Sequence, residues 1–271
     1  MGIVNVTPDS FSKDGTQTVE RAIAQGLEMA RQGADLLDIG GESTRPGADE
    51  VGVEEELARV VPVVEALSKQ LTIPLSIDSS KPAVMVAALA AGAALINDVT
   101  ALRGMEKAEK KGDGYLAQLV RSDVPIILMH MQGSPATMQQ APHYGDVISQ
   151  VYRFLAQRIA FCVANGIDKQ RIIVDPGIGF GKTANHNLAL LRRQRILRGL
   201  GAPLLLGLSR KQIVGTLSQE SEPQQRDASS HLLAALGYLA GAQIFRVHDV
   251  RGAKQALRVA RGWWMGLEGA P

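Results

Sequence analysis

The stretch RIIVD at residues 171–175 shows how this chain is built, because a short apolar run rich in β-branched residues ends on a carboxylate. Similar runs recur along the chain, and each is followed by polar residues. The predicted strands are Gly2–Val6, Leu36–Ile39, Pro74–Ile77, Ala94–Ile96, Pro125–Met129, Arg171–Val174, Pro203–Leu208 and Gln243–Val247. Nearly continuous apolar character is typical of parallel strands covered on both faces.

Helical patterns separate the strands, and several end at a glycine, as helices often do. The predicted helices are Val19–Gln32, Val53–Leu71, Lys81–Ala91, Asp146–Asn165, Asn185–Leu200, Asp227–Ala240 and Gly252–Leu267. No linker or low-complexity segment interrupts this alternation, so residues 1–271 are expected to form one domain.

A strand–helix alternation can form a closed barrel or a doubly wound open sheet. The polar residues at the strand ends favour the barrel, since every strand supplies them, whereas the crevice of an open sheet uses only a few strands. The sequence therefore predicts an α/β fold, a single-domain (β/α)₈ TIM barrel. The strand-end residues are Asn5, Asp38, Asp78, Asn97, His130, Asp175, Lys211 and Arg246.

Composition narrows the function only broadly. The 271 residues include 29 Lys and Arg against 27 Asp and Glu, so no bulk charge favours binding to nucleic acid or a membrane. No apolar run is long enough for a membrane span, and the N-terminus does not resemble a leader. The single cysteine, Cys162, cannot form an internal disulfide and reads as a small core residue. We expect a soluble, cytoplasmic protein.

The charges at the strand ends indicate two kinds of ligand. Asp78 and Asp175 accept hydrogen bonds and Asn97 can both accept and donate, which suits a flat heterocycle rich in N–H groups. Each aspartate could instead cap a helix or pair with a base. The cationic residues suit an anionic leaving group, because barrels often hold phosphate after the last two strands. They are Arg45, Lys211, Arg246 and His248.

Other motifs fail on inspection. The stretch PGIGFGKT at residues 176–183 resembles a P-loop, but Pro176 stands where the first glycine should be. Its glycines suit a loop with unusual backbone angles or close approach to a ligand. No spacing typical of a zinc site occurs among Cys162 and the histidines. His130, between two methionines, can be read equally as a packed or a reactive residue.

Taken together, eight strings resemble the signature segments of the dihydropteroate synthase family, and they occur in family order over nearly the whole chain. They are MGIVNVTPDSFS (1–12), DIGGESTRPG (38–47), ID (77–78), INDV (96–99), LMHMQG (128–133), DPGIGFGK (175–182), SRK (209–211) and RVHDV (246–250). The resemblance implies a TIM barrel that joins a dihydropterin diphosphate to 4-aminobenzoate in folate biosynthesis.

The resemblance also implies a role for each matching residue. A pterin site would contain Asp78, Asn97, Met129, Asp175, Phe180, Gly207 and Lys211. A diphosphate site would contain Asn5, Thr44, Arg45, Arg246 and His248, with Mg²⁺ bound at Asn5. A 4-aminobenzoate site would contain Thr7, Pro8, Phe11, Arg45, Pro46, Ser209 and Lys211. Catalysis would rest on Asn5, Arg45, Lys211, Arg246 and His248. The family is typically a homodimer built through late helices, with which the apolar 232–239 segment is compatible.

The chain departs from the family pattern in three places. Family members carry an extension before the first strand, so here either other residues cover the barrel floor or a segment has been trimmed. The first loop is slightly shortened at residues 13–15, and residues 104–115 are longer than usual. We expect the 104–115 segment to be a solvated surface insertion. A sharper hypothesis is that these loop changes alter discrimination between 4-aminobenzoate and sulfonamides.

Two other functions are compatible with parts of this pattern. A pterin-dependent methyltransferase reads the same heterocycle but binds no diphosphate, and the four cations at the strand ends argue against it. A non-catalytic pterin-binding protein would be marked by the loss of loop or diphosphate residues, and none is lost.

Overall fold

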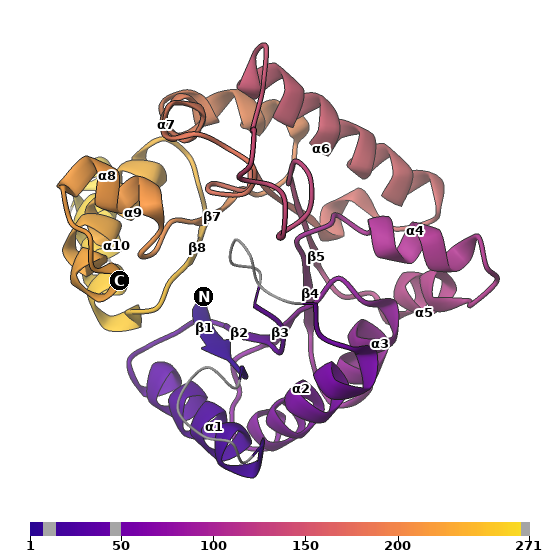
Figure 1. The fold of residues 1–271 in the computed structure, drawn as a ribbon. Coiled ribbons are helices and arrows are strands. Elements are labelled where there is room, and N and C mark those ends of the chain that lie inside the picture. Colours follow the sequence, from indigo (N-terminus) through magenta and orange to yellow (C-terminus); the bar gives the residue numbers. More distant parts are fainter. Residues whose placement is uncertain (8–14, 44–49, 267–271) are drawn as a thin grey trace.

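The computed structural model describes residues 1–7, 15–43 and 50–266, which form a barrel of parallel strands surrounded by helices (Figure 1). All eight predicted strands are confirmed, with small differences at their ends. They are β1 (Gly2–Asn5), β2 (Leu37–Gly40), β3 (Leu75–Asp78), β4 (Leu95–Asp98), β5 (Ile126–Met129), β6 (Ile172–Asp175), β7 (Leu205–Gly207) and β8 (Ile244–Arg246).

The strands close on themselves. β1 to β6 form one parallel sheet in chain order, and β7 pairs with β8. A bridge between Val174 and Leu204 connects β6 to β7, and a bridge between Gly2 and Val247 connects β8 back to β1. The Ile3 amide donates to the Val247 carbonyl at 3.0 Å across that last junction. The predicted TIM barrel is therefore confirmed, and the doubly wound alternative is wrong.

The helices lie outside the strands. They are α1 (Gly15–Arg31), α2 (Val53–Ser68), α3 (Pro82–Ala90), α4 (Arg103–Glu109), α5 (Tyr115–Ser122), α6 (Val147–Ala164), α7 (Ala184–Arg193), α8 (Gln212–Ser218), α9 (Asp227–Leu239) and α10 (Val250–Met265). The seven predicted helices are present, although the one expected over residues 185–200 divides into α7 and a 3₁₀ segment, Gln194–Leu200. The sequence missed α4, α5 and α8, which are too short to show a clear helical period. Leu267, the expected end of the last helix, lies outside the described residues.

The barrel interior changes character along its axis. Leu95, Ile127, Ile173 and Leu205 form a small apolar cluster with Met1, separate from the larger core between strands and helices. Because strand side chains alternate with a period of two, the next inward residues on these strands are Asn97, Met129, Asp175 and Gly207. The apolar cluster thus lies at the N-terminal ends of the strands, where Met1 belongs to the barrel floor. The polar side chains lie at the other end.

The segment 104–115 is only partly the solvated insertion that was expected. Helix α4 buries Met105 completely and leaves Ala108 only 9% exposed. Glu106 on the same helix accepts a hydrogen bond at 2.8 Å from Arg158 Nη1 on α6. Residues 109–113 form a continuously exposed stretch, and Lys107 is exposed as well. The expectation is wrong for the first half of the segment, because two apolar residues three apart place one helical face in the core.

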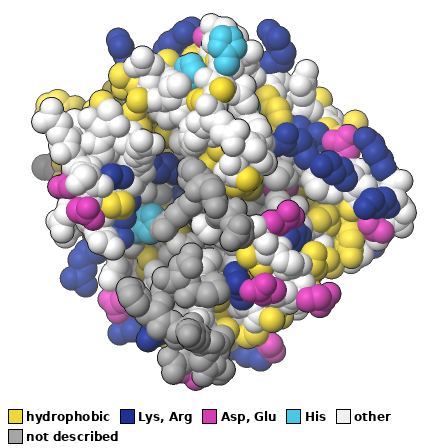
Figure 2. All heavy atoms as spheres, in the orientation of Figure 1, with side chains coloured by type: hydrophobic (Ala, Val, Ile, Leu, Met, Phe, Trp, Pro, Cys, Tyr) yellow, Lys and Arg dark blue, Asp and Glu magenta, His cyan; other side chains and the backbone are white. Residues whose placement is uncertain are grey.

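The surface carries both signs of charge. Figure 2 shows acidic and basic side chains interspersed around the rim of the face it presents. None of the helices in the described part of the chain is both long and apolar enough to span a membrane.

Candidate active site

Arg246, at the end of β8, joins carboxylates from two other strands. Its Nε donates to Asp38 Oδ2 on β2 at 2.5 Å, and its Nη2 donates to Asp78 Oδ2 at the end of β3 at 2.7 Å. Asn97 Nδ2, on β4, donates to the same Asp38 oxygen at 2.9 Å. Four strands therefore bring a guanidinium, two carboxylates and an amide into contact at the mouth of the barrel. We call these four residues the Arg246 cluster.

The Arg246 cluster contains two carboxylates and one guanidinium, so one negative charge has no cation within the cluster. Burial raises the pKa of Asp78 to about 7, although Arg246 opposes this effect. Burial disfavours the charge of Arg246, but Asp38 and Asp78 outweigh it and raise the pKa of the guanidinium above its ordinary value. Asp38 is 0% exposed, and its Oδ1 has no hydrogen-bond partner in the described structure. A ligand that presents N–H donors would satisfy the remaining acceptors.

Asp175 and Lys211 form a second charged group beside the first. Asp175, which ends β6, accepts a hydrogen bond from the Gly177 amide at 2.7 Å. Burial raises the pKa of Asp175, and Lys211 opposes this shift. Burial lowers the pKa of Lys211 to about 8, and the attraction of Asp175 opposes this shift. Lys211 Nζ donates to the Ile178 carbonyl and lies 4.5 Å from the centroid of the Phe180 ring.

Apolar groups and a glycine lie beside these charges. Met129, at the end of β5, is 3% exposed and belongs to an apolar cluster against which Phe180 packs. A Cβ added to Gly207 would lie 3.6 Å from Lys211 Nζ and 4.0 Å from Arg246 Cβ. The missing side chain therefore leaves space between the two cations. A flat ring can pack against these apolar groups while the acceptors beside them bind the polar edge of the ring.

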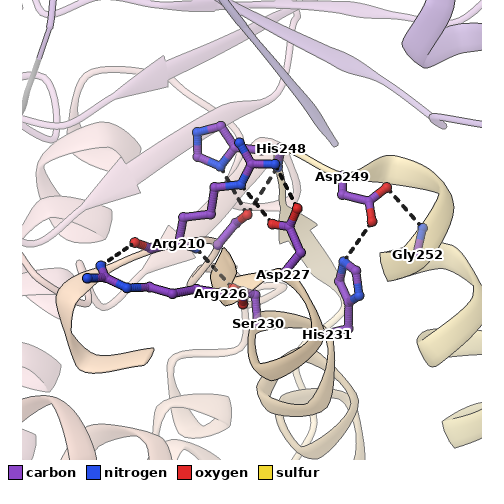
Figure 3. A network of polar contacts seen from close by, with 9 residues as sticks. Arg210, Arg226, Asp227, Ser230, His231, His248, Asp249 and Gly252 are labelled. Atoms are coloured by element: carbon purple, nitrogen blue, oxygen red, sulfur yellow. Dashed lines mark hydrogen bonds and ion pairs between the residues drawn. The ribbon is translucent and has the colours of Figure 1, made fainter. Parts of the chain in front are cut away.

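The turn after β7 places three consecutive side chains differently. Ser209 Oγ lies 3.0 Å from Nδ1 of His248 and accepts from the backbone amide of His248 at 3.2 Å. Arg210 adopts φ 61°, in the left-handed region, and donates to both carboxylate oxygens of Asp227 on α9, each at 2.7 Å. Figure 3 shows Arg210 reaching from the turn to Asp227. Its two neighbours, Ser209 and Lys211, make their contacts with other parts of the site.

The remaining predicted site residues come from the first two loops. Asn5 ends β1 with an exposed side chain, and Thr7 follows it half-buried. The structure therefore brings Asn5 to the same end of the barrel as the Arg246 cluster. Five predicted residues lie outside the described part of the chain: Pro8, Phe11, Thr44, Arg45 and Pro46.

Within residues 1–7, 15–43 and 50–266, no group of three or more His, Cys, Asp or Glu side chains could hold a metal ion. Mg²⁺ bound together with substrate phosphates usually takes only one or two protein ligands and keeps several waters. Asn5 fits that requirement, because its amide oxygen is a hard donor and is exposed at a strand end.

His130 is a packed residue. It is 6% exposed, and its ring lies edge-on to Phe154 with centroids 4.9 Å apart. Burial lowers the pKa of His130 to about 3, and the nearby Lys182 adds to the effect. Of the two readings that the sequence left open, the structure favours packing.

Sequence reasoning assigned no role to several residues that the structure brings to this end of the barrel. Asp38 is central to the Arg246 cluster, and a charged residue inside an apolar strand was its available signal. Lys182 lies buried behind the glycine-rich loop. Lys81 Nζ contacts Glu42 Oε2 at 2.8 Å and Glu56 Oε2 at 2.6 Å, and no spacing in the sequence indicates that group.

Comparison with known proteins identifies close relatives. The family described as "Pterin binding enzyme" matches residues 1–248. The dihydropteroate synthase of Escherichia coli K12 is 44% identical over 260 residues, which cover 96% of this chain and 89% of that protein. The solved structure of Xanthomonas albilineans dihydropteroate synthase with 4-aminobenzoic acid is similar over 100% of this chain and 93% of that one, with a TM-score of 0.88 and 51% identity. A sulfonamide complex of the Yersinia pestis enzyme covers 97% and 93%, with a TM-score of 0.88 and 45% identity.

Proposed function

The chain belongs to the pterin-binding enzyme family, among its dihydropteroate synthases, and we propose on this premise how its site performs the reaction. It is a transferase of folate biosynthesis that condenses 6-hydroxymethyl-7,8-dihydropterin diphosphate with 4-aminobenzoate, giving 7,8-dihydropteroate and diphosphate. The observation that best supports the catalytic assignment is the Arg246 cluster, in which one cation is shared by two carboxylates and the buried Asp38 Oδ1 has no donor among the described residues. The whole of residues 1–271 would act as one domain.

The pterin ring would lie over Met129 and Phe180, with its polar edge toward the carboxylates. Asp78 and Asp175 would accept its N–H groups, and Asn97 would supply both a donor and an acceptor. Gly207 would leave room for the ring, and Lys211 would hold its carbonyl side. Burial raises the pKa of both aspartates. Hydrogen bonds from the N–H groups of the ring would oppose this shift and favour the ionised carboxylates when the substrate binds.

The chemistry is the replacement of one bond at the pterin methylene. The arylamine nitrogen forms a C–N bond while the C–O bond to diphosphate breaks, and the bonding electrons leave with the diphosphate. The new arylammonium then releases its proton to water, so a strong general base is unnecessary. The main difficulty is the negative charge on the departing group, together with positive charge at the methylene.

Arg246 and His248 would stabilise the departing diphosphate, helped by Asn5, Thr44 and Arg45. Among the described residues the Arg246 guanidinium uses Nε and Nη2 for carboxylates, which leaves Nη1 for a phosphate oxygen. Mg²⁺, held by Asn5 and by the substrate's own oxygens, would neutralise part of the developing charge. We assign it to Asn5 because of that residue's exposed amide at the end of β1.

The 4-aminobenzoate site would be formed by Thr7, Pro8, Phe11, Arg45, Pro46, Ser209 and Lys211. We also propose that the shortened first loop at residues 13–15 makes the enzyme insensitive to sulfonamides. Figure 1 places α4 and α5 on the outside of the barrel, so the 104–115 segment does not support this idea. Sulfonamide inhibition constants measured beside the KM for 4-aminobenzoate test it, and ordinary inhibition would contradict it.

The reaction itself is tested by diphosphate release from purified protein. Release should require both substrates and Mg²⁺, and it should be accompanied by 7,8-dihydropteroate. Release with the pterin substrate alone would indicate hydrolysis, and no release at all would reduce the protein to pterin binding. Methyl transfer from a methylated pterin would instead support the methyltransferase alternative.

Two neighbouring helices suggest how copies of the chain associate. Leu232 and Leu236 on α9 are 61% and 52% exposed, and Val259 on the adjoining α10 is 73% exposed. Exposed apolar side chains on two helices in contact are typical of a protein interface. We propose a homodimer through α9 and α10, in the cytoplasm. Light scattering after gel filtration of wild type and Leu236→Asp tests the assembly, which the substitution should dissociate.

A further inference from the structure

Lys182 is a buried cation whose ammonium points into the protein. It is 3% exposed, although it follows a loop at the mouth of the barrel. Its Nζ donates to the Gly177 carbonyl at 2.8 Å and to the Phe180 carbonyl at 2.9 Å. It also lies 3.0 Å from His130 Nδ1 and 3.3 Å from the His130 carbonyl. The proposed function gives this lysine no contact with substrate.

The contact with His130 links the protonation states of the two side chains. A protonated Lys182 has three donors and no acceptor, so in that state His130 Nδ1 accepts from it and the ring proton lies on Nε2. A neutral imidazole agrees with the lowered pKa of His130, which burial causes. His130 therefore acts here as an acceptor held in place by its packing against Phe154.

The loop that Lys182 holds is closely packed and rich in glycine. Gly177, Gly179 and Gly181 all have positive φ, between 63° and 85°. A Cβ on Gly177 would lie 1.9 Å from the His130 carbonyl oxygen, and one on Gly181 would lie 2.5 Å from that of Gln132. Glycine loses more conformational freedom on folding than other residues, so a loop with glycine at three alternate positions has little intrinsic stability. Hydrogen bonds to the loop carbonyls are therefore needed to keep one conformation.

Three site residues depend on that conformation. The Ile178 carbonyl accepts from Lys211 Nζ, and the Phe180 ring lies beneath the same ammonium. The Gly177 amide donates to Asp175. Lys182 bonds to the carbonyls of Gly177 and Phe180, on either side of Ile178. A shift of the loop would move both the lysine and the aspartate assigned to the pterin.

We propose that Lys182, with His130 as its acceptor, is a positioning residue for the pterin site. It holds the loop 176–182 so that Asp175, Phe180 and Lys211 meet the pterin ring, and it touches no substrate. The proposal rests on the proposed function, since it concerns the same site. It also gives a role to Lys182 in the glycine-rich motif, for which the sequence indicated only a loop.

The test is Lys182→Ala, followed by direct binding of the pterin diphosphate and by steady-state kinetics. We expect pterin affinity to fall ~10- to 100-fold, the range for a lost hydrogen-bonded charge. The KM for 4-aminobenzoate should change less, because the loop reaches that site through Lys211 whereas it reaches the pterin through Asp175, Phe180 and Lys211. Propylamine replaces the deleted atoms and should restore binding, whereas propanol should not. Lys111→Ala removes an exposed lysine and serves as the matched control.

A second pair of variants covers the case in which Lys182→Ala does not fold. His130→Asn keeps an acceptor near Nδ1 and should retain most of the pterin affinity, whereas His130→Leu should not. Unchanged pterin affinity in Lys182→Ala, or in His130→Leu, would overturn the proposal. So would rescue by propylamine no better than by propanol, because Lys182 would then only fill space. Failure of the wild-type enzyme to release diphosphate would instead contradict the proposed function, and binding would still test the role of Lys182.

Discussion

On β2 and at the ends of β3 and β8 the charged side chains pair with one another, whereas the lysines that follow β6 and β7 pair mainly with backbone carbonyls. Arg246 donates to the carboxylates of Asp38 and Asp78. Lys182 and Lys211 donate instead to carbonyls of the loop between β6 and α7. Both arrangements keep charge at the mouth of the barrel. They differ in whether a side chain or a folded loop supplies the partner.

The difference predicts different consequences of mutation. A side-chain pair is broken by one substitution, and the partner is left as an uncompensated buried charge. A lysine bound to carbonyls leaves neutral groups behind when it is removed, so stability suffers less but the loop loses its conformation. Substitutions in the Arg246 cluster should therefore act on stability and catalysis together, and those on the lysine side mainly on substrate affinity.

The largest effect is expected from Arg246→Met. Asp38 would remain fully buried without its cation, so the free energy of unfolding should fall by about 3–5 kcal/mol. Loss of a group that stabilises the leaving diphosphate should also lower kcat by at least ~10²-fold. Chemical denaturation and initial rates measure the two effects. Arg251→Met, an exposed arginine on α10, is the control. Loss of activity with an unchanged free energy of unfolding would show that the cluster does not contribute to stability.

Asp175→Asn should give a smaller and more selective loss. The amide oxygen can still accept from the Gly177 amide, but the negative charge that Lys211 balances disappears. We expect the KM for the pterin diphosphate to rise ~10- to 100-fold, with a much smaller change for 4-aminobenzoate. Steady-state kinetics with each substrate varied in turn measures this, and Asp113→Asn changes an exposed aspartate in the same way. Equal changes in both KM values would remove the distinction between the two sites.

The same contrast explains what the sequence could and could not predict. Asp78, Asn97 and Asp175 were predictable, because each stands at the end of an apolar run and parallel strands bring such ends together. Asp38 was harder to assign, since its partner Arg246 is distant in sequence. Lys182 could not be assigned at all, because its partners are backbone carbonyls. Every residue has one, so no sequence pattern marks them. Short helices such as α4 and α8 were missed for a related reason, since tertiary packing stabilises them more than their own pattern does.

The pH dependence of stability should separate the two regions. Burial raises the pKa of Asp78 from 3.8 to about 7, so between these values the folded state keeps a proton that the unfolded state has lost. Stability from this group is present below pH ~4 and is lost as pH rises toward 7, by at most about 1.4 kcal/mol per pH unit.

The lysines have the opposite slope. Burial lowers the pKa of Lys182 from 10.5 to about 7 and that of Lys211 to about 8. The unfolded state therefore binds more protons between pH ~8 and 10.5, and stability should rise with pH in that window. Denaturation at a series of pH values should show the acid slope reduced in Asp78→Asn and the alkaline slope reduced in Lys182→Met. Slopes that each substitution leaves unchanged would refute this assignment.

The smallest effect is expected from Asp227→Asn. This substitution tests whether burial or ion pairing determines how much stability is lost. Arg210 and Asp227 form a side-chain pair of the same kind as Arg246 and Asp38, but their side chains are 27% and 26% exposed. Solvent can replace the lost partner, so stability should fall by only about 0.5–1 kcal/mol. The substitution would still affect the turn, because Arg210 has a left-handed backbone conformation between Ser209 and Lys211. A rise of a few-fold in the KM for 4-aminobenzoate should follow. Asp35→Asn, in the exposed pair with Lys254, is the control and should alter neither quantity. A loss as large as that in Arg246→Met would mean that pairing itself, rather than burial, sets the effect.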